Sequence, residues 1–97
     1  MTGEKLKSMF AIYRAELDMR KPLILPVQLD DEDTLKTVFN ISSDRMYAYF
    51  KFMCDRAQKF VDDGRIEKAM RWLGFLQGTF WNLGLFTLDE LKHHSMP

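Results

Sequence analysis

A run of apolar residues at alternating steps of three and four constrains this chain more than any other feature of its sequence. The run comprises Ile66, Ala69, Leu73, Leu76, Phe80 and Leu83. This spacing is typical of a helix that packs along one seam. We therefore predict a helix from about Arg65 to Leu83, which Gly84 ends.

A second helix is predicted just before it, from Ser42 or Ser43 to about Asp62. Its apolar stripe comprises Met46, Phe50, Met53, Ala57 and Phe60, and it is widened by Tyr47, Cys54 and Val61. Ser42 is suited to the N-cap, and Gly64 is suited to a left-handed C-cap. The link between the two helices is very short, so they are predicted to form an antiparallel helical hairpin.

The N-terminal part predicts one more helix and an extended connector. Apolar residues at helical spacing indicate a helix from about Glu4 to Met19, and Pro22 ends it. The segment 22–29 contains a second proline, Pro26, and is predicted to be extended; two prolines disfavour a central strand. Its apolar side chains are expected to lie across the core.

Two short helices complete the predicted architecture. The acidic run 30–33 precedes apolar residues at helical spacing and is expected to form the first turn of a short helix. A calcium loop is the alternative, but its glycine and distal glutamate are missing. Thr87 and Glu90 form a capping box that predicts a last helix from about Leu88 to His94. Residues 1–97 are thus expected to form one all-α domain, a small bundle of four to five helices centred on the hairpin.

The composition excludes several classes of protein. With 14 basic and 14 acidic residues the formal net charge is zero, which disfavours nonspecific nucleic-acid binding. The single cysteine, Cys54, rules out an intrachain disulfide. Charges run throughout residues 1–20, so no signal peptide is expected and the cytoplasm is the expected compartment. The uncharged stretch 72–88 is short for a membrane span and is interrupted by polar residues and glycines, so a membrane role is disfavoured.

The sequence also offers little catalytic chemistry. His93 and His94 are adjacent and would point about 100° apart on a helix, so a metal site is not expected and both are expected to be solvated. Cys54 lies among apolar neighbours and is expected to be a buried, inert thiol. Neither a nucleophile elbow nor a phosphate-cradling loop is present. We therefore expect no enzyme activity and no cofactor.

Large apolar side chains on more than one face of the hairpin indicate a second buried surface. Tyr49 and Phe52 point away from the stripe of their helix, and Trp72, Phe75 and Trp81 lie off the seam of theirs. These five residues are the predicted binding surface. A homo-oligomer, most simply a two-fold dimer, would cover it, and a second protein is the alternative.

Two glycines add a further contact feature to the hairpin. Gly74 and Gly78 share one face of their helix and leave a groove where another helix can approach closely. Each costs roughly 1 kcal/mol relative to alanine, so we expect a packing gain to offset the cost.

Basic and aromatic residues also suggest a small anionic ligand, because Arg and Lys beside an aromatic ring can clamp a phosphate and stack a base. The candidates are Tyr13, Arg14, Arg20, Lys21, Arg45 and Tyr47, and Tyr49 and Trp72 of the hairpin are further aromatic candidates. A separate basic edge comprises Arg56, Lys59, Arg65, Lys68 and Arg71. It could touch DNA phosphates, but we expect a solvated face whose charges pair locally with Asp55, Asp62, Asp63 and Glu67.

The C-terminal third carries the order Arg71-Trp72-Leu73-Gly74-Phe75-Leu76-Gln77-Gly78, followed by Trp81, Gly84 and Thr87 to Leu91. This order resembles a pattern in a family of small proteins encoded by tailed bacteriophages. The resemblance implies a phage-type accessory protein in the cytoplasm of a bacterial host, and it carries over no functional residues.

Small non-enzymatic phage proteins often disable a host component by binding it. We therefore expect stoichiometric binding that inhibits host defence or regulation, with a host protein as the target. An oligomeric sponge that sequesters a nucleotide immune signal is the first alternative. A structural oligomer or a weak DNA-binding hairpin is the second.

Overall fold

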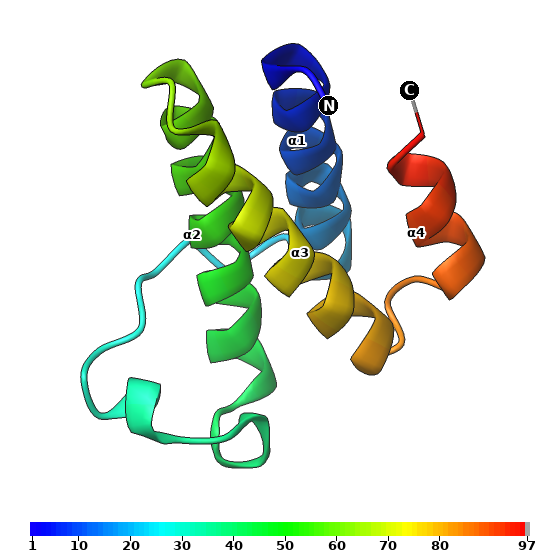
Figure 1. Cartoon of the computed structure of the whole chain (residues 1–97). Coiled ribbons are helices and arrows are strands. Elements are labelled where there is room, and N and C mark those ends of the chain that lie inside the picture. The colour runs from blue at the N-terminus through cyan, green and yellow to red at the C-terminus, as the bar shows by residue number, and fades with distance from the viewer. Residues whose placement is uncertain (97) are drawn as a thin grey trace.

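Four α-helices and two 3-10 turns make up the chain in the computed structural model, which describes residues 1–96 (Figure 1). Helix α1 spans Gly3–Arg20, α2 spans Ser43–Asp62, α3 spans Ile66–Asn82 and α4 spans Leu88–His94; the turns are η1 (Asp33–Leu35) and η2 (Val38–Asn40). No strand occurs in the described part of the chain. The predicted all-α bundle is confirmed, and its hairpin is α2–α3.

The helix ends follow the local signals of the sequence. The Ser42 hydroxyl accepts a hydrogen bond from the Arg45 amide at 3.2 Å. Thr87 and Glu90 exchange both bonds of the capping box, at 3.1 and 2.9 Å. Gly64 and Gly84 adopt φ values of +79° and +76°, a left-handed conformation that side chains with a Cβ rarely adopt. Gly64 and Gly84 therefore each allow a turn that reverses the chain.

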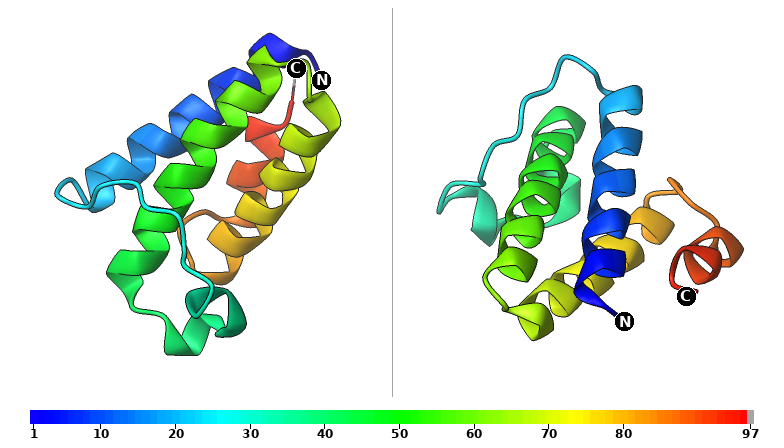
Figure 2. Two further views of the ribbon diagram at one scale, coloured as in Figure 1. Left: turned by 90° about the vertical axis from the view of Figure 1, so that its left-hand side faces the viewer. Right: turned by 90° about the horizontal axis from the view of Figure 1, so that it is seen from above.

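The core lies where α1, α2 and α3 meet. Helix α1 runs alongside α2 and makes the most extensive helix contact, while α3 crosses in front of both (Figures 1 and 2). The Phe80 ring of α3 contacts Tyr13 and Phe50 edge to face, with ring centroids 5.3 and 5.7 Å apart. The hairpin therefore depends on α1 for much of its burial.

The segment 22–41, which we call the strap, departs from its predicted structure in two respects. It forms no α-helix; the acidic run leads only into η1 and η2. Leu23 and Leu25 are 91% and 75% exposed, so the expectation that the apolar residues of 22–29 lie across the core is wrong. An extended chain turns alternate side chains to opposite sides. Ile24 and Pro26 are accordingly half-buried, whereas Leu23 and Leu25 are exposed.

A fully buried lysine joins the strap to the bundle. Lys51 in α2 is 0% exposed. Its ammonium donates to the carbonyl oxygens of Lys21 and Ile24 at 2.6 and 2.7 Å, and it pairs with Asp18 at 3.0 Å. A cation at the C-terminal end of α1 is also attracted by the negative end of the helix dipole. Lys51 therefore fixes the point where the chain leaves α1.

Helix α2 holds the strap through residues spaced three apart. After Lys51, the Ala48 carbonyl accepts a hydrogen bond from the Val27 amide at 3.1 Å. Arg45 then forms an ion pair with Asp33, whose side chain is buried. The strap thus runs beside α2 and returns beneath its N-terminal end (Figure 2).

Candidate functional site

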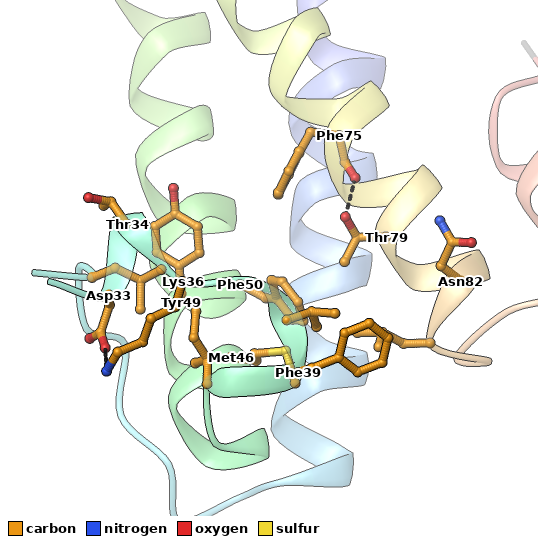
Figure 3. A pocket seen from close by; sticks show the side chains of 14 residues that line it. Asp33, Thr34, Lys36, Phe39, Met46, Tyr49, Phe50, Phe75, Thr79 and Asn82 are labelled. Carbon is orange, nitrogen blue, oxygen red and sulfur yellow. Dashed lines mark hydrogen bonds and ion pairs between the residues drawn. The ribbon is translucent and has the colours of Figure 1, made fainter. Parts of the chain in front are cut away.

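An open apolar groove lies between the strap, the first half of α2 and the second half of α3 (Figure 3). Its volume is about 810 Å³. The residues that line it are Leu29, Asp33, Thr34, Lys36, Val38, Phe39, Ile41, Met46, Tyr49, Phe50, Phe75, Thr79, Asn82 and Leu83. Three separate parts of the chain supply these side chains, so the groove exists only in the folded protein.

Two aromatic side chains are the most exposed rings of this groove. Phe39, in η2, is 93% exposed, and Phe75, on α3, is 54% exposed. Phe50 is buried and belongs to the core beneath them. Rings that remain open beside a hollow of this size are typical of a surface that another molecule covers.

Most polar side chains of the groove are already hydrogen-bonded within the chain. The Thr79 hydroxyl donates to the Phe75 carbonyl at 2.7 Å, and the Asn82 amide donates to the Gly78 carbonyl at 3.0 Å. At the strap, Lys36 donates to Asp33 at 3.2 Å (Figure 3). The groove therefore offers a ligand mainly apolar contact.

A charged pair marks the strap side of the groove. The hydrogen bond from the Arg45 guanidinium lowers the pKa of Asp33 below its ordinary value, and Lys36 adds to this effect. Asp33 therefore stays ionised at neutral pH. The pair fixes the strap relative to α2.

The five residues of the predicted binding surface do not form one surface. Tyr49 and Phe75 line the apolar groove. Tyr49 also forms a wall of a second hollow, together with Phe52 and Trp72. Trp81 lies apart from these, in a hollow between α3 and α4. Tyr49, Phe52 and Trp72 are only partly exposed, because they pack against the core.

The second hollow, which we call the basic hollow, has a volume of about 300 Å³. It is lined by Gln28, Leu29, Thr34, Tyr49, Phe52, Arg56, Phe60, Arg65, Lys68 and Trp72. Three of these residues are cations and none is a carboxylate. It adjoins the apolar groove, since Tyr49 lines both.

The expected local pairing of the basic edge is wrong. Asp55 pairs with Arg14 of α1, and Asp62 pairs with Lys7 of α1 at 2.7 Å. Within residues 1–96, no cation of the basic edge lies within 4.0 Å of a carboxylate. Helix α1 therefore pairs with two of the four carboxylates that were expected to pair with the basic edge.

The six predicted anionic-ligand residues are not gathered into one site. Tyr13 is buried in the core, where its hydroxyl accepts from Gln77 at 2.9 Å and lies 3.0 Å from the Nδ1 atom of His94. Burial raises the pKa of Tyr13. Tyr13 therefore holds helices together and is closed to a ligand.

The other members of that set are already partnered. Arg14 pairs with carboxylates of α1 and α2, and Arg45 pairs with Asp33. Arg20 pairs with Glu16 at 2.9 Å and donates to the Leu85 carbonyl. Lys21 pairs with Asp44 at 3.3 Å and lies 5.7 Å from the centre of the Tyr47 ring. None of these cations has a charge left uncompensated within the described residues.

The glycine face of α3 is open. A Cβ atom added at Gly74 or Gly78 would meet nothing within 4 Å. No part of residues 1–96 makes the close approach that was predicted. A packing gain that offsets the two glycines therefore does not come from this part of the chain.

The remaining reactive side chains are mostly enclosed. Cys54 is buried as predicted, and burial raises its pKa to about 12. His94 was expected to be solvated but is half-buried against Tyr13 and Phe86, because α4 folds back onto α1 and α3. Among the described residues no three His, Cys, Asp or Glu side chains are placed to share a metal ion. None of the helices in residues 1–96 combines the length and apolarity needed to cross a bilayer.

No family model, curated protein or solved structure matches the chain.

The sequence alone does not reveal two residues of these sites. Phe39 follows Leu35 and Val38 at the spacing of a buried helical face, so the sequence predicts that its ring is buried and not exposed. Phe60 belongs to the apolar stripe of α2, and only the folded hairpin brings cations around its ring.

Proposed function

We propose that this chain is a phage-type accessory protein that acts by stoichiometric binding. Its target is a host defence or regulatory protein, and the apolar groove holds an apolar segment of that target. The observation that carries the proposal is the pair of open rings, Phe39 and Phe75, beside a hollow of about 810 Å³. Aromatic anchors in such pockets dominate the affinity of many protein interfaces.

Binding without catalysis agrees with the chemistry of the chain. Most polar side chains of the groove are hydrogen-bonded within the chain, which makes them poorly placed to act on a substrate. The one thiol, Cys54, is buried and protonated at neutral pH. The phage origin rests on the C-terminal sequence pattern described above.

The groove is tested with a matched pair of substitutions on α3. Phe75 and Trp81 are 54% and 52% exposed, but only Phe75 lines the groove. The tagged protein is purified from the bacterial host, the retained protein is identified, and its affinity is measured by calorimetry. We expect Phe75→Asp and Phe39→Asp to weaken binding at least about tenfold, and Trp81→Asp to leave it unchanged.

Two results would contradict this function. One is the absence of any host protein retained in stoichiometric amount. The other is a partner whose affinity is equal for Phe75→Asp, Phe39→Asp and the unmodified chain. Far-UV circular dichroism of each variant checks that the helices are intact.

Self-association is part of the proposal. The strap exposes Leu23 and Leu25, and the glycine face of α3 is open to another helix. A two-fold dimer is the simplest assembly that would cover such surfaces. Size-exclusion chromatography with light scattering should give twice the 11.5 kDa chain mass. A monomer mass at micromolar concentrations would contradict this part alone.

A further inference from the structure

Three cations converge on a single aromatic ring at the junction of α2 and α3. The Lys68 ammonium lies 4.7 Å from the centre of the Phe60 ring. The guanidinium carbons of Arg65 and Arg56 lie 5.2 and 6.0 Å from the same point. Phe60 is buried, so its ring forms the base on which the three charges gather.

The charges of this cluster are uncompensated. Within residues 1–96, none of Arg56, Arg65 and Lys68 has a carboxylate within 4.0 Å, whereas Arg14 and Arg45 each have two. All three lie within 6.0 Å of the same ring centroid, so three like charges gather on one small part of the surface. They therefore repel one another, and a bound anion would relieve the repulsion.

Flat aromatic surfaces adjoin the cluster. The Trp72 ring contacts Phe60 edge to face, with centroids 4.8 Å apart, and Lys68 lies 6.0 Å from the Trp72 centroid. Tyr49 lines the same hollow from α2 and is only partly buried. The basic hollow thus sets aromatic rings and unpaired cations around one space.

We propose that the basic hollow binds a nucleoside phosphate. Arg56, Arg65 and Lys68 hold the phosphate groups, because guanidinium groups donate in pairs to phosphate oxygens and an ammonium adds a compact charge. The base lies against Trp72 and Tyr49, since every base has a face that can stack on an aromatic ring. The volume of about 300 Å³ lies at the lower end for small-molecule sites, which favours one nucleotide over a dinucleotide.

This site is independent of the host-protein function of the apolar groove, so either proposal can fail alone. It shares only the aromatic candidates Tyr49 and Trp72 with the anion site suggested by sequence. The basic residues of that earlier set are paired with carboxylates. The cations of the basic hollow remain available to a ligand.

A single-tryptophan variant makes the site observable. Trp81→Phe removes the tryptophan that lies between α3 and α4 and leaves Trp72 as the only reporter. Fluorescence is titrated with ATP, with adenosine and with pyrophosphate, so the complete probe is compared with each of its halves. We expect ATP to quench Trp72, and we expect adenosine and pyrophosphate each to bind at least about tenfold more weakly.

Charge-removing variants in the same background locate the phosphate contacts. Arg56→Gln and Lys68→Gln should each weaken ATP binding about tenfold or more. Arg71→Gln is the matched control, because Arg71 belongs to the same basic edge but does not line the hollow. Added salt should weaken ATP binding further, since the contacts are ionic.

Four outcomes would overturn the proposal. ATP at millimolar concentration could leave Trp72 fluorescence unchanged, or the three Gln variants could behave alike. Pyrophosphate could bind as tightly as ATP, which would show that the aromatic rings contribute nothing to binding. A single-stranded oligonucleotide could bind at least tenfold more tightly than ATP, which would make the hollow a nucleic-acid contact.

Discussion

The buried ammonium of Lys51 predicts a large loss of stability when it is replaced by methionine. Lys51→Met keeps an unbranched side chain of similar length and removes two hydrogen bonds to carbonyl oxygens and one ion pair. Removing one partner of a fully buried pair costs about 3–5 kcal/mol. Asp18 is half-exposed and keeps Arg14 as a partner, so the loss of the ion pair costs less here.

The two hydrogen bonds to carbonyl oxygens account for most of the expected loss of stability. Hydrogen bonds to a charged group contribute about 1.5–3 kcal/mol each, and methionine recovers part of this because it is buried more easily than lysine. The Lys21 carbonyl keeps a hydrogen bond from the Ile24 amide at 3.2 Å, whereas the Ile24 carbonyl keeps none within residues 1–96. We therefore expect a net loss of about 2–3 kcal/mol, out of a total of roughly 5–15 kcal/mol for a domain of this size.

Urea unfolding followed by circular dichroism measures this loss. With a slope of about 1 kcal/mol per molar urea, the midpoint should fall by about 2–3 M. Lys59→Met is the control, since Lys59 is an exposed lysine of the same helix and should contribute less than about 1 kcal/mol. If the two variants unfold within about 0.5 kcal/mol of each other, the buried ammonium does not stabilise the junction of α1 and the strap.

Three further outcomes follow from the structure. Gly74→Ala and Gly78→Ala should each raise the free energy of unfolding by about 0.5–1 kcal/mol in urea titrations at dilutions where the chain is monomeric, because the added Cβ meets open space; a lower value there would mean that the face is covered within the chain. Cys54, whose pKa is raised to about 12 by burial, should not react with a thiol reagent at neutral pH until the protein unfolds; rapid labelling of the native protein would contradict its burial. Because Arg45 lowers the pKa of Asp33 below 3.8, the contribution of this carboxylate to stability is complete above pH 3.8 and is lost as the pH falls through the lowered pKa. Asp33→Asn should therefore reduce the fall of the urea midpoint on acidification, and an unchanged pH profile would contradict the pairing.

The helices could be predicted from sequence because their signals are local. Ser42 and Thr87 cap helices through amides three residues away. Gly64 and Gly84 act through their own backbone angles. In the apolar stripes of α2 and α3, successive residues are only three or four positions apart. Each signal involves residues that are neighbours before the chain folds, so its meaning does not depend on the rest of the structure.

The strap and the ionic partners could not be predicted in the same way. Arg14 pairs with Asp55 across 41 residues, and Lys7 pairs with Asp62 across 55. These distant pairs changed which cations remained unpaired, and so moved the candidate anion site to the basic hollow. The burial of Lys51 is indicated by the sequence, because this residue stands four residues after Tyr47 and three before Cys54 on the widened apolar stripe of α2. A charged residue at such a position indicates a buried partner but does not identify it.

The attachment of the strap to α2 has a consequence for chain length. The contacts at Arg45, Ala48 and Lys51 depend on the helical phase of α2, and one inserted residue would turn everything beyond it by about 100°. An insertion between Arg45 and Lys51 would therefore detach one end of the strap. Between its attachment points the strap is exposed and irregular, and an extra residue there could bulge into solvent. Natural variants that keep the groove should thus differ in length in the strap and not in the first half of α2.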